Sequence, residues 1–280
     1  MFFDRYREFS TEDPRISRAE YQPTVDFLSL RYSNMLPAES IKNCTVLDIG
    51  SCISSLGAWA LANGANHYTG LEIQRELTQI AERNLSRYFD KSLWQVINKD
   101  AEQWLLDMDW YDVIVVAGTL QTFNDPVSAI KKLSVHTDCL IIESTHPHLY
   151  SEMLTEIYQQ EIFTDQEKNM LHTLLESRVF KDTFRNLLEE KLPIMYNRNS
   201  RTIFKSQNNQ PTNVEVNATY PSIGFLNNIM CNLGFRPDLT INNNLKKTIP
   251  AHYNWPGRFA VCYKRQENCK TLKFQDYDHS

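Results

Sequence analysis

The sequence predicts an α/β fold, in which a mostly parallel sheet is covered by helices on both faces. Short apolar runs of strand length recur between residues 45 and 143, and helical patterns separate several of them. The run at 45–49 leads through a glycine turn into a helix, and a second run at 68–71 ends at an acid, Glu72. Strands that alternate with helices in this way build parallel sheets.

The stretch 44–72 forms one strand–helix–strand unit. Thr45–Ile49 has the length and apolar content of a buried parallel strand. After the turn that starts at Gly50, Ser54 and Ser55 can cap a helix expected over 56–63. Such a unit binds a nucleoside outside the carboxyl ends of its strands, where the acid at the second tip can accept hydrogen bonds from both ribose hydroxyls.

The turn also indicates which nucleoside cofactor fits. A dinucleotide fingerprint needs G-x-G-x-x-G, and only Gly50 is present, with Cys52 and Ser55 at the other two places. A pyrophosphate would meet a side chain at Cys52, so a nicotinamide-linked oxidoreductase is disfavoured. A cofactor without phosphate, such as S-adenosylmethionine, is better tolerated.

The motifs VLDIGS, LANGA and YTGLE, within residues 46–72, resemble the first two motifs of class I S-adenosylmethionine-dependent methyltransferases. The family pattern is D/E-x-G-x-G-x-G; this chain has Cys52 and Ser54 at the later glycines. The resemblance implies a seven-stranded Rossmann-like sheet with an antiparallel last hairpin, and S-adenosyl-L-methionine as cofactor. The cofactor-binding residues it implies in this unit are Asp48, Gly50, Ser51, Cys52, Glu72 and Ile73. The alternative is an α/β protein that uses this turn only for packing.

Length, charge and cysteine content limit the classes of protein to which the chain can belong. With 280 residues, the chain can form one α/β domain with an insertion, or two small domains. The net charge of −5 disfavours a large nucleic-acid footprint, which needs a basic face. Six cysteines without C-x-x-C spacing indicate free thiols in a reducing compartment. The charged N-terminus is unlike a signal peptide and no apolar run reaches membrane length, so we expect a soluble, cytoplasmic protein without membrane contact.

The segments before and after the first unit extend the pattern. Residues 1–43 predict an N-terminal helical cap; the resemblance implies that such helices lie over the cofactor pocket. A helix is expected over 74–88 and a third strand over 94–97. The resemblance then implies that Asp100 receives the adenine amine and that the N–H of Ala101 reaches a ring nitrogen. Asp100 is equally placed to cap a helix, and the two roles are compatible.

The fourth and fifth strands, expected over 111–117 and 139–143, carry the candidate chemistry. Residues 118–126 are similar to a G-V-L-Y-H-L-x-D-P segment of small-molecule and tRNA methyltransferases, which implies that Gly118 lies near the reactive sulfonium. Gln121-Thr122 stands where Tyr-His is common, so a general base is missing at this place. Either the acceptor needs no base, or one of Glu143, His146 and His148 supplies it; His146 is ranked first because it follows the fifth strand by three residues. Glu143 can alternatively position the acceptor or be a solvent-facing end residue. His146-x-His148 is too weak a pattern for a metal site.

Residues 146–219 predict a helical insertion and a polar loop. Two amphipathic stripes within 149–187 suggest a lid or substrate pocket, with a dimerisation surface as the rival interpretation. The stretch 194–220 is expected to be mostly loop, with a short strand or hairpin at 201–205. Tyr196, Asn197 and Arg198 are candidate substrate-binding residues, against the alternative of an ordinary polar loop.

Residues 220–265 complete the core expected over 44–145, and 266–280 form a polar tail. The helical pattern at 222–235 resembles the late helix of class I methyltransferases, closest to the tRNA wobble-uridine carboxymethyltransferase branch and its small-molecule relatives. The last strand is expected over 258–264, with Arg258 as a further substrate-binding candidate.

The sequence therefore predicts methyl transfer to a small molecule or an RNA, with RNA disfavoured by charge. Carboxymethyl transfer from a carboxylated cofactor is one alternative, in which Arg198 or Arg258 supplies the cationic partner. A non-catalytic methyltransferase-like binding protein is the other.

Overall fold

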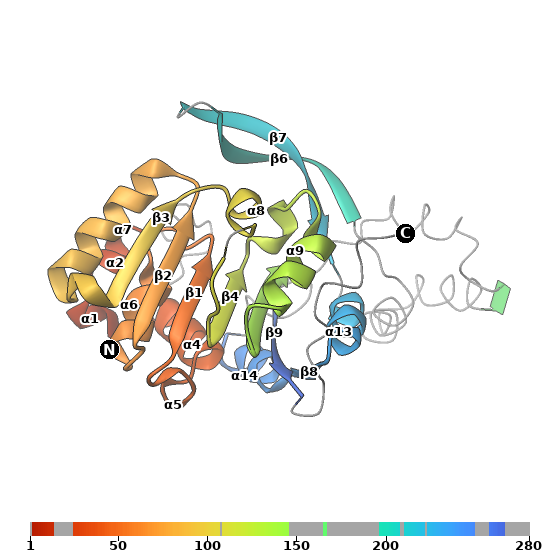
Figure 1. The fold of residues 1–280 in the computed structure, drawn as a ribbon, viewed down its shortest axis with the longest axis horizontal. Helices are drawn as coiled ribbons and strands as arrows, with labels where there is room; N and C mark the ends of the chain where they lie inside the picture. The colour runs from red at the N-terminus through yellow and green to blue at the C-terminus, as the bar shows by residue number, and fades with distance from the viewer. Residues whose placement is uncertain are drawn as a thin grey trace.

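The structure is a computed structural model that describes residues 2–13, 25–106, 108–145, 165–166, 196–207, 210–221, 223–249 and 258–266. Its centre is a seven-stranded sheet with the order β3-β2-β1-β4-β5-β9-β8 (Figure 1). The five strands β1 to β5 run parallel, and β9 pairs antiparallel with both β5 and β8. This confirms the predicted fold class, including the antiparallel last hairpin. The strands are β1 (Thr45–Ile49), β2 (His67–Glu72), β3 (Trp94–Asn98), β4 (Val113–Ala117), β5 (Cys139–Thr145), β8 (Phe235–Asp238) and β9 (Arg258–Arg265).

The strand order places a switch point between β1 and β4. From β1 the chain moves outward through β2 to β3, and then returns to the other side of β1 to form β4. The two loops that leave β1 and β4 therefore diverge to opposite sides of the sheet, and ligands of open α/β sheets bind in the crevice that results.

Helices cover both faces of the sheet, which explains why β1 and β4 are almost wholly apolar. Alternate residues of β1, β4, β5 and β9 enter two separate hydrophobic clusters, one on each face. The first face carries α1 (Phe2–Arg5), α2 (Glu8–Thr11), α4 (Val25–Met35), α6 (Ser55–Ala62), α7 (Arg75–Tyr88) and α14 (Thr240–Thr248). The second carries α9 (Pro126–Ser134) and α13 (Ile223–Asn232). Short elements complete the described chain: α5 (Ala38–Ile41), η1 (Lys91–Leu93), α8 (Ala101–Trp104) and η2 (Leu120–Thr122).

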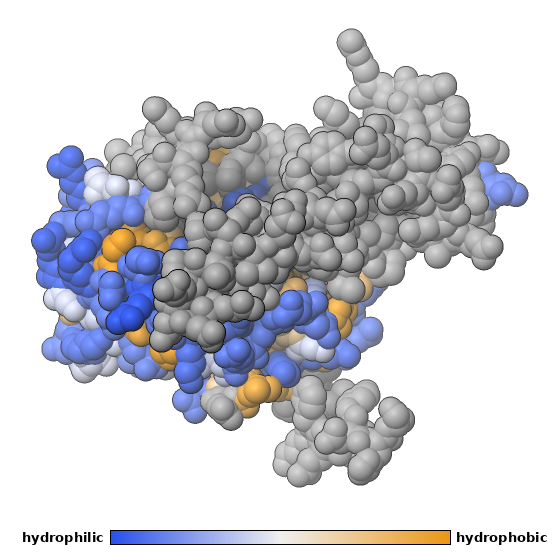
Figure 2. Space-filling model, turned by 90° about the horizontal axis from the view of Figure 1, so that it is seen from above, coloured by the Kyte–Doolittle hydropathy of each residue, from blue (hydrophilic) through white to orange (hydrophobic). Residues whose placement is uncertain are grey.

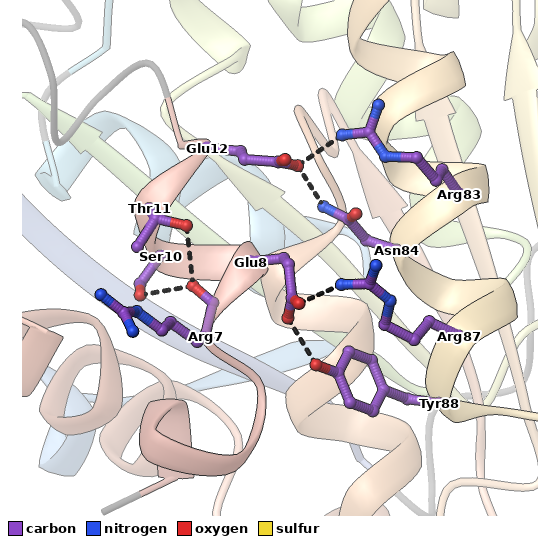
Figure 3. Close-up of polar contacts among 9 residues, drawn as sticks. All are labelled: Arg7, Glu8, Ser10, Thr11, Glu12, Arg83, Asn84, Arg87 and Tyr88. Carbon is purple, nitrogen blue, oxygen red and sulfur yellow. Dashed lines mark hydrogen bonds and ion pairs between the residues drawn. The ribbon is translucent and has the colours of Figure 1, made fainter.

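The N-terminal helices are part of the sheet's core. Phe3 and Phe9 are buried in the same cluster as residues of β1 and β2. Polar contacts to α7 hold α2 in place (Figure 3): the Glu12 carboxylate accepts hydrogen bonds from Arg83 at 2.6 Å and from Asn84 at 2.8 Å. Glu8 likewise pairs with Arg87 and accepts a hydrogen bond from the Tyr88 hydroxyl, which lowers the pKa of Glu8. The predicted N-terminal cap is thus anchored at residues 2–13, while 14–24 lie outside the described residues.

A separate two-stranded sheet differs from the expectation of a mostly polar loop. β6 (Tyr196–Gln207) and β7 (Gln210–Tyr220) pair antiparallel, with an irregularity between Arg198 and Arg201. Thr202, Ile203 and Phe204 in β6 and Val214 and Val216 in β7 favour strands, and this preference outweighs the asparagine content that suggested a loop. β7 lies against η2, just after β4, so the hairpin stands over the carboxyl end of the central sheet (Figure 1). Of the predicted insertion, residues 146–164 and 167–195 lie outside the description, so its role as lid or dimer surface stays a prediction.

The view onto this edge of the molecule shows a mostly hydrophilic surface among the described residues, with small apolar areas between them (Figure 2). No helix in the described part of the chain is long and apolar enough to cross a membrane. The cysteines of the described ranges, Cys44, Cys52, Cys139, Cys231 and Cys262, are free thiols.

Candidate functional site

The turn between β1 and α6 has an unusual backbone. Gly50, Cys52 and Ser54 all have positive φ, at 75°, 54° and 59°. The N–H groups of Gly50 and Ser51 both donate to the Leu71 carbonyl, at 2.8 and 3.0 Å, and this ties the turn to the tip of β2. A Cβ on Gly50 would lie 2.1 Å from Thr119 Oγ1, so no side chain fits there without movement. The turn therefore takes the backbone shape of three alternating glycines, although two of the three places hold other residues.

The expected serine cap of α6 is wrong. Ser54 occupies the cap position, but its side chain makes no capping hydrogen bond, because a cap residue normally has an extended backbone and Ser54 is left-handed. Ser55 Oγ instead donates to the Phe9 carbonyl at 2.8 Å, which links α6 to the N-terminal segment.

Glu72, at the tip of β2, is held by the backbone of the two flanking loops. Its Oε2 accepts the N–H of Cys52 at 2.8 Å, and its Oε1 accepts the N–H of Gln74 at 2.9 Å. The side chain is 6 % exposed, and burial raises the pKa of this carboxyl, with the nearby Asp48 adding to the rise and the backbone donors opposing it. A carboxylate offers about four acceptor sites, so each oxygen of Glu72 can accept a further hydrogen bond.

A buried polar cluster supports the turn from below. The Tyr68 hydroxyl donates to Asp48 Oδ2 at 3.1 Å, and burial together with this carboxylate raises the pKa of Tyr68. Ser51 Oγ and Ser54 Oγ lie 2.9 and 3.0 Å from the place that a Cβ of Gly70 would take. Because Gly70 lacks a side chain, both hydroxyls and the tyrosine fit beneath the turn.

A cavity of about 190 Å³ opens at the carboxyl ends of β1 to β4. Glu72 lies on one wall and Asp100 on another; Asp100 Oδ1 also caps α8 by accepting the N–H of Glu102 at 2.8 Å. Glu102 accepts the backbone N–H of Asn124 at 2.7 Å, which fixes α8 to the loop after η2. The lining residues are Gly50, Leu71, Glu72, Ile73, Gln74, Lys99, Asp100, Ala101, Glu102, Gly118, Thr119, Thr122 and Phe123.

The structure brings together most of the predicted cofactor residues. Those that line the cavity are Gly50, Glu72, Ile73, Asp100, Ala101 and Gly118. Asp48 and Ser51 line a smaller cavity beside it, together with Arg31 and Ala117. Cys52 contributes its backbone N–H to Glu72, and its side chain is buried. The assignment of these residues to a cofactor stays a prediction.

Glu143, two residues before the end of β5, is fully buried and ion-paired. Arg31 of α4 forms a two-pronged pair with it: Nε donates to Oε1 at 3.2 Å, and Nη2 donates to Oε2. Nη1 of Arg258, on β9, lies 3.6 Å from Oε1. The interpretation of Glu143 as a solvent-facing residue is therefore wrong, and holding the two guanidinium groups fits this carboxylate better than proton transfer does.

Other candidates could not be placed at the cavity. His146 lies outside the described residues, and for Tyr196, Asn197 and Arg198 the structure describes only the backbone of β6. In the ranges that are described, no cluster of histidine, cysteine or acidic residues could hold a metal ion.

Sequence reasoning missed Arg31. Leu28 and Tyr32 are buried on one face of α4, and Arg31 lies on that same face with 3 % exposure. A charged residue within the apolar stripe of a helix is the signal that would have found it, because such a charge needs a partner in the core.

Comparison with known proteins identifies the domain. Residues 47–135, which run from β1 to α9 and include the glycine turn, Glu72, Asp100 and Gly118, match the family model of a methyltransferase domain. The chain contains a methyltransferase domain. No curated protein matches the sequence. The fold that this domain shares with a solved structure extends beyond the matched residues, over 85 % of the chain.

A structure from Listeria monocytogenes, assigned as an S-adenosylmethionine-dependent methyltransferase, is 16 % identical and has a TM-score of 0.53; the match covers 85 % of this chain and 99 % of that one. An S-adenosylmethionine-dependent methyltransferase from Mesorhizobium loti is 12 % identical with a TM-score of 0.49, over 86 % and 97 % of the two chains. Magnesium protoporphyrin IX methyltransferase from Synechocystis PCC 6803 is 12 % identical with a TM-score of 0.49, and the match covers 94 % of this chain and 91 % of that one. The domain match confirms the predicted resemblance to methyltransferases, and the structure from Listeria monocytogenes shows the shared fold.

Proposed function

We propose that this methyltransferase acts on a small molecule, and that it holds S-adenosylmethionine in the cavity at the carboxyl ends of β1 to β4. The observation that carries the proposal is the geometry of Glu72. Two backbone N–H groups orient its carboxylate on the cavity wall, at 2.8 and 2.9 Å, and leave acceptor capacity for the two hydroxyls of a ribose.

The remaining walls of the cavity fit the adenosine part. Asp100 offers a carboxylate beside the N–H of Ala101, and this acceptor–donor pair complements the donor–acceptor edge of adenine. Gly50 and Gly118, both at positive φ, let the backbone approach closely where a side chain would fill the space. S-adenosylmethionine supplies a methyl group on a sulfonium, which is transferred by in-line displacement.

In this reaction the protein aligns the acceptor with the methyl group and the sulfur, and it excludes water from the site. Gln121 stands where the related segment has an aromatic residue before its histidine, and its Nε2 donates to the Gly118 carbonyl at 2.6 Å. This fixes the backbone at the tip of β4. An amide does not titrate at neutral pH, so Gln121 positions the strand end and moves no proton.

The acidic charge balance supports a small acceptor. The net charge is −5, and a polynucleotide track needs a basic face that neutralises phosphates. RNA is the alternative acceptor, and a methylation assay with RNA as substrate tests it.

Calorimetric titration tests the proposal. We expect S-adenosylmethionine and S-adenosylhomocysteine to bind, and NADH not to bind. Binding of NADH alone, or of none of the three, would contradict the proposed site. The carboxylated analogue of S-adenosylmethionine belongs in the same series, because tighter binding than that of S-adenosylmethionine would favour carboxymethyl transfer instead.

A further inference from the structure

We propose that Cys139 and Cys262 are an oxidation site: a peroxide joins them in a reversible disulfide, and this bond clamps β9, the last strand in the chain, to β5. The inference goes beyond the proposed function and does not depend on it. Neither cysteine lines the cavity at the carboxyl ends of β1 to β4, and the reaction needs no cofactor.

The contact between the two sulfur atoms carries the inference. Their Sγ atoms lie 3.5 Å apart, so that one thiol donates its S–H to the other sulfur. Cys139 begins β5, and Cys262 lies in the middle of β9, opposite Ile141 in the antiparallel ladder. The two cysteines are therefore diagonal neighbours, and both pack in the hydrophobic cluster of the same face. Closure of a disulfide needs the sulfurs to approach from 3.5 Å to about 2.05 Å.

The other cysteines of the described ranges have different surroundings. Cys44, which is partly buried before β1, contacts the backbone carbonyls of Ser40 and Lys42 at 3.6 and 3.7 Å. Cys231 is exposed near the end of α13, and Cys52 is buried in the glycine turn. Within the part of the chain that the structure describes, Cys139 and Cys262 are thus the two sulfurs placed to join.

The surroundings of the pair favour a thiolate on Cys262. The thiol of Cys139 lowers the pKa of Cys262, the nearby ammonium group of Lys264 lowers it further, and burial opposes both. The contact with Cys262 and burial raise the pKa of Cys139, which therefore stays a thiol. Cys262 is the nucleophile of the pair because the thiolate is the reactive form. Cys139 is only partly buried, so a small oxidant reaches the pair from its side.

Hydrogen peroxide balances the reaction. The Cys262 thiolate attacks one oxygen, the O–O bond breaks, and a sulfenic acid forms on Cys262 while hydroxide leaves and takes up a proton from solvent. The sulfur of Cys139 then attacks Cys262, the S–O bond breaks, and the hydroxyl leaves with the proton of Cys139 as water. The two thiols lose two electrons, the peroxide gains them, and two molecules of water are produced.

The position of the bond in the chain gives it a stabilising role. The two cysteines are 123 positions apart, and the loop that they close contains the β6–β7 hairpin, α13, β8 and α14. A cross-link over a long loop stabilises the fold because it restricts the unfolded chain. Diagonal neighbours lie farther apart than directly opposite residues, so the bond forms with strain and is readily reduced again.

Peptide mapping of the full-length protein tests the inference. The reduced protein is treated with a small molar excess of hydrogen peroxide, remaining thiols are blocked with N-ethylmaleimide in denaturant, and the digest is analysed by mass spectrometry without reduction. We expect two peptides joined through Cys139 and Cys262, which dithiothreitol separates. The Tm of the oxidised protein should exceed that of the reduced protein by roughly 3–10 °C, and dithiothreitol should abolish the difference.

Two serine variants separate this pair from the other thiols. Cys139→Ser should form no such link, and peroxide should not raise its Tm. Cys44→Ser is the matched control, because Cys44 is a partly buried thiol close enough to influence Cys139, and it should form the link as the wild type does. The comparison of oxidised with reduced wild type decides the inference even where a variant folds poorly.

Three results would overturn the inference: both thiols are still labelled by N-ethylmaleimide after peroxide, peroxide converts them to sulfinic acids without a cross-link, or the cross-link joins a different pair of cysteines. A cross-linked protein with an unchanged or lower Tm would contradict the clamp. Failure of the proposed function is a separate result, because it is measured by titration of the reduced protein with S-adenosylhomocysteine.

Discussion

β2 and β5 each carry a glutamate at or near the carboxyl end of the strand, but the two glutamates have different partners. β2 ends at Glu72, and β5 has Glu143 near its end. Both side chains are almost completely buried. Glu72 is held by two backbone N–H groups and lies on the cavity wall. Glu143 is held by guanidinium groups from α4 and β9 and does not line that cavity.

The difference shows that the partner decides the role of a strand-tip acid. Backbone donors orient Glu72 without neutralising it, so it stays an acceptor for a ligand. Arginine partners neutralise Glu143 and turn it into a structural support that joins the N-terminal helix α4 to the last strand. Both acids follow similar sequence patterns, and only the fold distinguishes them.

The largest effect expected from this comparison is on stability at the β5 tip. Glu143→Gln removes the charged partner of buried Arg31, and we expect the free energy of unfolding to fall by about 3–5 kcal/mol. Urea unfolding of wild type and variant measures this directly. A loss below about 1 kcal/mol would contradict the structural role of the pair.

The double variant Arg31→Met/Glu143→Leu sharpens the same test. It replaces the pair by apolar side chains of similar length, and we expect it to recover most of the lost stability, because buried ion pairs and well-packed apolar groups often contribute about equally. A double variant as unstable as Glu143→Gln would mean that the site requires charge for folding.

A smaller change in stability is expected from substitutions in the turn that supports Glu72. Cys52 has a left-handed backbone, which costs a non-glycine residue roughly 1–2 kcal/mol, whereas a glycine adds roughly 0.5–1 kcal/mol of unfolded-state entropy. Cys52→Gly should therefore raise the free energy of unfolding by up to about 1 kcal/mol. Its affinity for S-adenosylhomocysteine should not change, because the N–H that Glu72 accepts belongs to the backbone.

Gly50→Ala is the matched variant in the same turn and should act in the opposite direction. Its added Cβ would lie 2.1 Å from Thr119 Oγ1, so both stability and affinity should fall. Destabilisation by Cys52→Gly would show that the thiol packing of this turn outweighs its backbone strain.

The sequence predicted the parallel half of the fold because its signals are local. β1 to β5 each contain a short apolar segment, and α7 carries its apolar residues at helical spacing, so each could be placed within about two residues. α14 was not predicted, and of the β6–β7 hairpin only a short strand or hairpin at 201–205 was expected. Both regions are rich in asparagine and other polar residues that single-residue preferences assign to loops.

The residues of the candidate site likewise fall into those with a local sequence signal and those without one. Gly50, Glu72 and Asp100 could be found because they follow strands directly, and strand ends meet at one edge of a sheet. The pair between Arg31 and Glu143 could not, because 112 positions separate the two residues and neither carries a local sign of the other. Only the folded structure shows that arginine side chains pair with Glu143.

The central claim is that Glu72 binds the cofactor's ribose, and titration of Glu72→Gln with S-adenosylhomocysteine tests it most directly. The control is Glu76→Gln, the same substitution on the exposed first turn of α7. We expect Glu72→Gln to lose roughly 1.5–3 kcal/mol of binding free energy, because a charge-assisted hydrogen bond is removed, and Glu76→Gln to bind as the wild type does. Equal affinity of Glu72→Gln and the wild type would contradict the account.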